Sequence, residues 1–159
     1  TEIYTLSLHD ALPIFFLWCA PGHGGDRQTW DFVKSGDMVQ LVYGVPESDV
    51  VTVLFRCEGS PKRIEIVSTV VPAKLRMGQS AQTVLRNGRK MAGYDGKIGR
   101  DSIDAPFHFQ AEVPAEAQVT EILKGGSSLA IGAAGKKQRI PLRGISVPLA
   151  QFETQCFGR

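Results

Sequence analysis

The stretch from Val50 to Val71 constrains the fold of this chain more than any other. It reads VVTVLFRCEG, then SP, then KRIEIVSTVV, which is two β-rich runs joined by a Gly-Ser-Pro turn. In the first run Val53, Phe55 and Cys57 share one face, and in the second run the isoleucines alternate with Arg and Glu. Alternation with a period of two is typical of strands that have one buried face and one wetter face. The sequence therefore predicts a β-hairpin at the centre of the fold.

Turn-forming residues also divide the rest of the chain into short segments. With 17 Gly and nine Pro in 159 residues, the composition favours many short strands over a few long helices. We expect a mainly β protein, either a β-sandwich or a partly open barrel of about nine short strands, with two short helices, the second at the C-terminus. The expected strands span residues 28–34, 38–45, 50–59, 62–71, 81–86, 89–94, 106–111, 128–133 and 138–142, and the expected helices span residues 114–124 and 147–156.

Residues 1–25 are expected to lie apart from a single β-rich domain at residues 26–159. The opening TEIYTLSLHDALPIF resembles the translation of a sequencing adapter. The following FFLWCA and PGHGG resemble the end of a secretory signal peptide and its cleavage zone. We therefore expect a periplasmic or secreted protein; the alternative is an apolar start that packs on the domain. No run of 18 apolar residues occurs, so no membrane span is predicted.

Two of the three cysteines are predicted to face the core. Cys57 lies on the apolar face of its strand, and Cys156 continues the helical spacing of Leu149 and Phe152. In an oxidising compartment the pair would form a disulfide that closes a loop of roughly a hundred residues and stabilises the fold by about 4 to 5 kcal/mol. The alternative is a pair of buried free thiols.

No residue pattern predicts a catalytic site. The three histidines are scattered and no CxxC spacing occurs, so we expect neither a metal nor a cofactor. His108 stands between two phenylalanines and is interpreted as a structural or surface histidine. A hydrolase would need His108 to meet Asp101 or Asp104 in a pocket, and this remains the enzyme alternative.

A basic hairpin is the candidate binding site. Asn87-Gly88 predicts a two-residue turn, which would place Arg86 opposite Arg89. Like charges in that position are unfavourable unless they are solvated or meet an anion. A solvated hairpin tip is the alternative. The predicted binding residues, which have only Asp95 among them as an acidic neighbour, are Arg86, Arg89, Lys90, Tyr94 as a stacking platform, Lys97 and Arg100.

The order of several sequence segments in this chain is also recognisable. A tryptophan-containing strand precedes LVYGVPESDVVTVLFRC, and ILKGGSSLAIGAAGKKQRIPLRG precedes a terminal amphipathic helix that ends in cysteine. This order resembles a group of small uncharacterised periplasmic proteins of proteobacteria, and its tail is distantly similar to the invasion-associated locus B family. The resemblance implies a structural framework and an envelope location, and it brings no catalytic residue.

These features predict a non-catalytic periplasmic or envelope binding module that uses the basic hairpin on an anionic partner. The partner would be an anionic envelope component or another envelope protein. The formal net charge of +2 is too small to indicate a nucleic-acid partner. The alternatives are a small hydrolase near His108 and an accessory subunit of secretion or envelope assembly.

Overall fold

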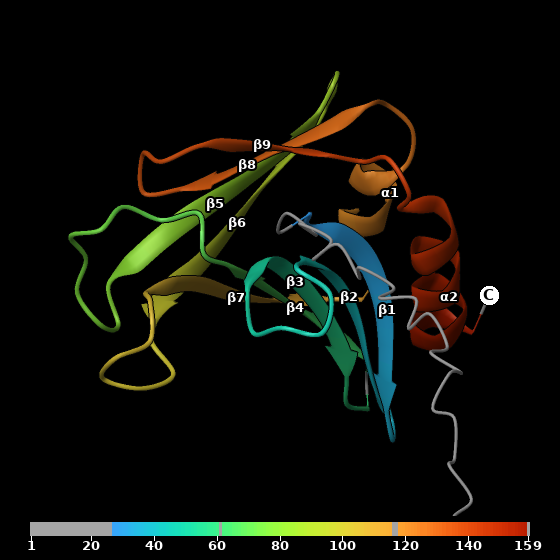
Figure 1. Ribbon diagram of the computed structural model, residues 1–159, viewed down its shortest axis with the longest axis horizontal. Coiled ribbons are helices and arrows are strands. Elements are labelled where there is room, and N and C mark those ends of the chain that lie inside the picture. The colour runs from blue at the N-terminus through green and yellow to red at the C-terminus, as the bar shows by residue number, and fades with distance from the viewer. Residues whose placement is uncertain (1–26, 61, 116–117, 159) are drawn as a thin grey trace, which may run out of the picture.

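The computed structural model describes residues 27–60, 62–115 and 118–158, so the expected leader at residues 1–25 lies outside the described residues. These residues form nine strands and two helices (Figure 1). In chain order they are β1 (Thr29–Ser35), β2 (Met38–Gly44), β3 (Val51–Glu58), β4 (Arg63–Ser68), β5 (Ser80–Asn87), β6 (Lys90–Gly99), β7 (His108–Pro114), α1 (Val119–Leu123), β8 (Ser128–Ala133), β9 (Gln138–Pro141) and α2 (Ser146–Phe157).

All nine strands pair antiparallel in one sheet, in the order β1-β2-β3-β4-β7-β6-β5-β8-β9. The sheet curls into a half-barrel with the helices beside it (Figure 1). The expected mainly β fold is therefore confirmed, and of the two architectures considered the chain adopts the partly open barrel. Because β8 pairs with β5, two segments about fifty positions apart in the sequence lie side by side.

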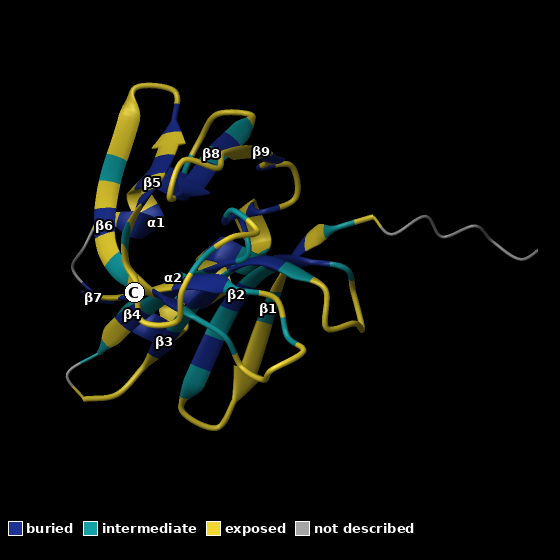
Figure 2. Ribbon diagram, turned by 90° about the vertical axis from the view of Figure 1, so that its left-hand side faces the viewer, coloured by how far each residue is buried: buried dark blue, intermediate teal, exposed yellow. Residues whose placement is uncertain are grey.

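The predicted central hairpin forms as β3 and β4. Phe55 pairs with Ile66, and Cys57 pairs with Ile64, and all four side chains are buried. Burial alternates along both strands, as Figure 2 shows by colour. The buried side chains define the inner face of the sheet, and the opposite side is called the outer face below.

Each helix covers a different part of the sheet. The C-terminal helix α2 packs against β1 and β2, whereas α1 packs against β5 and β6. In α2 the buried residues Leu149, Phe152 and Cys156 recur at helical spacing, as predicted. The ammonium group of Lys124, which follows α1, lies 2.8 Å from Glu121 and 2.8 Å from Glu153 of α2. This cation therefore connects the two helices.

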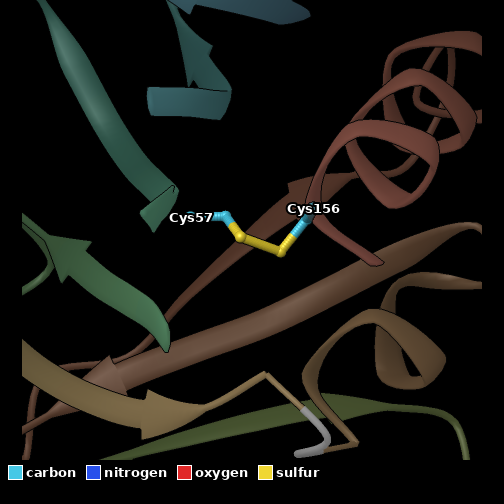
Figure 3. Close-up of a disulfide and its surroundings, with 2 residues drawn as sticks. All are labelled: Cys57 and Cys156. Atoms are coloured by element: carbon cyan, nitrogen blue, oxygen red, sulfur yellow. A yellow bond between two sulfur atoms is a disulfide. The ribbon is translucent and has the colours of Figure 1, made fainter. Parts of the chain in front are cut away.

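The predicted disulfide is present between Cys57 of β3 and Cys156 of α2 (Figure 3). The two Cα atoms are 5.8 Å apart, and both residues are buried, with 0% and 3% of their surface exposed. A pair so deeply buried is shielded from thiols in solution and acts as a structural crosslink. It fastens α2 to β3.

One hydrogen bond joins the two edges of the open sheet. The indole nitrogen of Trp30 in β1 donates to the carbonyl oxygen of Pro141 in β9 at 2.7 Å. The Trp30 ring also lies 5.1 Å from the ring of Tyr43 on the neighbouring strand. A buried indole N–H needs an acceptor, and here the acceptor belongs to the opposite edge strand.

Two local predictions were wrong. The strand expected at residues 89–94 is longer than predicted, because β6 extends from Lys90 to Gly99. A Cβ at Gly96 would lie 2.2 Å from the Gln110 carbonyl oxygen, so this glycine permits a close approach of β7 rather than a turn. The expected helix at 114–124 is shorter than predicted because β7 extends to Pro114, and α1 covers only Val119–Leu123.

Candidate functional site

The outer face of β5 carries the first component of the site. Thr83, Leu85 and Asn87 are buried on the inner face, so Val84 and Arg86 between them face outward. Pairing with β8 and β9 then places other outward residues beside them. The antiparallel register, rather than nearness along the sequence, determines which residues are neighbours on this face.

One cross-strand row contains two arginines. Arg86 pairs with Met91 on one side and with Ala130 on the other, and Ala130 pairs with Arg139. Arg86 and Arg139 are thus two strands apart, which is about 10 Å between backbones. Alanine between them leaves open space above the sheet. The row therefore places two guanidinium groups on either side of the surface above Ala130.

The turn between β8 and β9 brings two lysines to the same surface. Ala134 and Gly135 both have positive φ angles, 50° and 89°, and the Lys136 N–H donates to the Ala133 carbonyl at 3.1 Å. This is the pattern of a type I′ turn. A Cβ at Gly132 would lie 2.2 Å from the Lys136 carbonyl oxygen. The turn therefore folds closely over the glycine.

These elements enclose a groove of about 850 Å³ on the outer face, called the basic groove below. Among the residues that the structure describes, its lining contains four cationic side chains and no carboxylate. The lining residues are Gln82, Val84, Arg86, Asn87, Gly88, Met91, Gly126, Ser127, Ser128, Ala130, Ile131, Gly132, Ala133, Ala134, Gly135, Lys136, Lys137 and Arg139.

Among the described residues, the four cations of the basic groove have no acidic partner. The Arg86 Nε donates to the Gly88 carbonyl at 3.2 Å, and its terminal nitrogens have no partner within that part of the chain. Within the described residues, the side chains of Lys136, Lys137 and Arg139 form neither an ion pair nor a hydrogen bond. Several cations in one concave surface concentrate positive potential there. Such a surface attracts anions.

The predicted basic hairpin is not one surface. The β5–β6 turn centres on Gly88 and Arg89, so Arg86 faces Met91 and the expected opposition of Arg86 and Arg89 is wrong. Gly88 has a positive φ of 59° and Arg89 does not, which is the pattern of a type II′ turn. Arg86 joins the basic groove, whereas Arg89 is exposed at the tip.

Two of the predicted binding residues have structural contacts instead. The Lys90 ammonium donates to the carbonyl oxygens of Glu121 and Lys124 at 2.8 and 3.1 Å, so it caps the C-terminal end of α1. Tyr94 is only 8% exposed and cannot serve as an open stacking platform. Burial raises the pKa of Tyr94 above its ordinary value of 10.0.

The remaining two lie outside the lining of the basic groove. Lys97 is exposed further along β6. The Arg100 Nε donates to the Ala105 carbonyl at 2.6 Å, and its guanidinium lies 5.1 Å from the centre of the Phe107 ring. These contacts hold the loop between β6 and β7, so Arg100 is a loop-positioning residue here.

The residues of the enzyme alternative do not line the basic groove. His108 is buried, and its Nε2 lies 4.0 Å from a carboxylate oxygen of Asp101, which is itself 88% exposed. Neither His108, Asp101 nor Asp104 lines the basic groove or the smaller groove on the outer face of β1–β3. Within the described part of the chain, no three His, Cys, Asp or Glu residues are grouped so as to hold a metal ion, and no helix is long and apolar enough to cross a membrane.

Sequence reasoning missed three of the four groove cations. Lys136, Lys137 and Arg139 lie about fifty positions from Arg86, and only the pairing of β5 with β8 brings them together. The tract GKKQR was a usable signal, because it places three cations in five residues at a hairpin turn. Comparison with protein-family models, with curated proteins and with solved structures finds no match to this chain, so its geometry is the basis for assigning a function.

Proposed function

We propose that this protein is a non-catalytic binding module that holds an anionic ligand in the basic groove. The observation that carries the proposal is the set of four cations, Arg86, Lys136, Lys137 and Arg139, with no carboxylate among the described lining residues. A chain that leaves so many like charges together loses stability through their repulsion. An anion that enters the groove removes this repulsion and gains charge-assisted hydrogen bonds.

The lining chemistry favours binding over catalysis. Serine hydroxyls are present at Ser127 and Ser128, but the lining that the structure describes contains no histidine, aspartate or glutamate that could act as a general base. The arginines offer planar forks that match carboxylate and phosphate oxygens. The groove thus has the parts of an anion receptor.

The disulfide supports an extracytoplasmic location for this module. Crosslinks of this kind form and persist in the periplasm and outside the cell, where thiols are not kept reduced. The buried pair Cys57–Cys156 is such a crosslink. An anionic envelope component or an envelope protein with an acidic surface would meet the module there.

Charge reversal tests the proposal. Binding of polyglutamate and of polyphosphate is measured by calorimetry for the wild type and for Arg86→Glu/Arg139→Glu. We expect the variant to lose at least about tenfold in affinity, equivalent to about 1.4 kcal/mol. Wild-type binding should weaken as salt rises, because exposed charges are screened within about 8 Å at physiological salt.

Two matched controls separate the groove from bulk charge. Arg76→Glu/Arg143→Glu carries the same change in net charge at exposed positions outside the groove, and its affinity should remain near that of the wild type. Arg89→Glu/Lys97→Glu reverses two exposed residues of the predicted hairpin outside the groove and should also have a small effect. An equal loss in all three variants would show a general charge effect and overturn the groove assignment.

A further inference from the structure

The basic groove also has apolar parts that a pure anion receptor does not need. Met91 is 65% exposed and Val84 is 36% exposed, and both line the groove beside Arg86. Ala130 continues this apolar strip between the two arginines of the cross-strand row. No aromatic residue lines the groove within residues 27–60, 62–115 and 118–158. The groove thus alternates aliphatic and cationic positions.

This composition discriminates between classes of polyanion. Proteins that bind single-stranded nucleic acids combine a cationic groove with aromatic rings on which the bases stack, and the described lining has no aromatic ring. Polyphosphate has no apolar group to place on Met91 or Val84. Methionine and arginine are both enriched at the centres of protein–protein interfaces, where methionine adapts its shape to different partners. The lining therefore matches a protein partner best.

We infer that the ligand is an acidic peptide segment of a partner protein, with aliphatic side chains interspersed among its carboxylates. This inference rests on the proposed function and adds the class of ligand. Carboxylates of the segment pair with Arg86 and Arg139, and the two lysines of the β8–β9 turn meet further carboxylates. Aliphatic side chains of the segment cover Val84 and Met91 and remove their surface from water.

The geometry of the row suits an extended chain. The row Met91, Arg86, Ala130 and Arg139 crosses four adjacent strands, so it spans about 14 Å at the usual strand spacing. An extended peptide advances about 3.3 Å per residue and turns alternate side chains to the same side. A few residues are therefore enough to bring both carboxylates and aliphatic groups to the sheet.

Two peptides of equal length and charge test the inference. One alternates Glu and Val and the other alternates Glu and Ser, and polyphosphate serves as the third probe. We expect wild-type protein to bind the Glu/Val peptide about tenfold more tightly than the Glu/Ser peptide. The variant Val84→Thr/Met91→Gln keeps the charge and approximate shape of the groove, and it should bind both peptides equally.

The outcomes distinguish the inference from the proposed function. Equal affinity of both peptides for the wild type, or a preference that survives in Val84→Thr/Met91→Gln, overturns the peptide assignment and leaves the anion receptor intact. Tight binding of polyphosphate with weak binding of both peptides also overturns it. If none of the three probes binds, the proposed function itself fails. Circular dichroism of the variant checks its fold, which exposed substitutions should leave unchanged.

Discussion

The two halves of the sheet differ in whether the charged side chains on their outer faces are paired. On β3, β4 and β7, Arg56 lies 2.9 Å from Glu65, and Arg63 lies 2.8 Å from Glu112. On β5, β8 and β9, Arg86 and Arg139 have only Ala130 between them. Cross-strand ion pairs of the first kind stabilise a sheet modestly, whereas unpaired cations of the second kind do not. The second half therefore retains charge that is available to a ligand.

The inner faces differ as well. The first half is fastened to α2 by a disulfide, whereas the second half contacts α1 through buried apolar residues and hydrogen bonds. The Asn87 amide donates to the carbonyl oxygens of Ile122 and Gly125 at 2.8 and 2.6 Å, and Lys90 adds two more bonds. The comparison indicates a division between a covalently secured support and a binding half held by weaker bonds.

Removal of the crosslink should have the largest effect on stability. The two cysteines are 99 positions apart, and the chain-entropy model assigns about 4 to 5 kcal/mol to a loop of that size. We expect Cys57→Ala/Cys156→Ala to lower the free energy of unfolding by several kcal/mol, measured by urea denaturation. A loss below about 1 kcal/mol would mean that the first half does not depend on its covalent bond.

Loss of the Asn87 side chain tests the polar fastening of the second half. Asn87→Ala leaves two carbonyl oxygens at the end of α1 without their donor, so we expect a loss of about 2 to 3 kcal/mol. Hydrogen exchange should show reduced protection of α1. The control is Arg89→Ala, an exposed position in the adjacent turn, which should change stability by less than about 0.5 kcal/mol. Equal effects of the two variants would contradict the role of Asn87.

The two halves share one backbone feature, a turn residue other than glycine that has a positive φ angle. Glu47 in the β2–β3 turn and Ala134 in the β8–β9 turn have positive φ angles of 56° and 50°. Non-glycine residues in this region cost about 1 kcal/mol or more. We expect Glu47→Gly and Ala134→Gly each to raise the free energy of unfolding by about 0.5 to 1 kcal/mol. Urea denaturation measures both changes, and a loss of stability in either variant would contradict this account of backbone strain.

The smallest effect is expected at Lys124, which joins the two helices. Its hydrogen bond to Glu121, with a further contribution from Glu153, raises the pKa of Lys124 above its ordinary value of 10.5. Because the folded state holds this proton more tightly, the stabilisation is complete below pH 10.5 and is lost as pH rises through the raised pKa. Lys124 is partly exposed, so Lys124→Met should cost less than about 1 kcal/mol at neutral pH. Urea denaturation should show that the difference from wild type shrinks above that pKa, and a constant difference would contradict the ion-pair explanation.

Local alternation was sufficient to predict much of the fold. The central hairpin, the β8 strand and the C-terminal helix follow from side-chain periodicity, and the disulfide follows because both cysteines fall on the predicted core faces of these elements. The order of strands in the sheet did not follow from local patterns. Pairing of β5 with β8 is a contact between distant segments, and this pairing creates the basic groove.

The error at the β5–β6 turn has a tertiary cause. Asn-Gly is a strong turn signal when only neighbouring residues are considered. In the folded chain the Asn87 side chain is needed inside, where it binds the end of α1, so Asn87 stays in the strand and the turn moves one position onward. A shift of one residue changed the partner of Arg86 from Arg89 to Met91. Met91 is the aliphatic neighbour of Arg86 on which the proposed binding of an acidic peptide depends. This neighbour could not be predicted from the sequence.

The bond between Trp30 and Pro141 also bears on how copies of this protein meet one another. Leu142 N–H already donates to the Ser127 carbonyl, so the alternation of an antiparallel ladder turns the Pro141 carbonyl away from β8. That carbonyl is occupied by the indole, and proline has no N–H to offer. Along β9 an approaching strand finds only the outward backbone groups of Arg139 near the middle of a four-residue edge. Strand-to-strand aggregation, which needs a long row of open backbone groups, is therefore blocked at this edge.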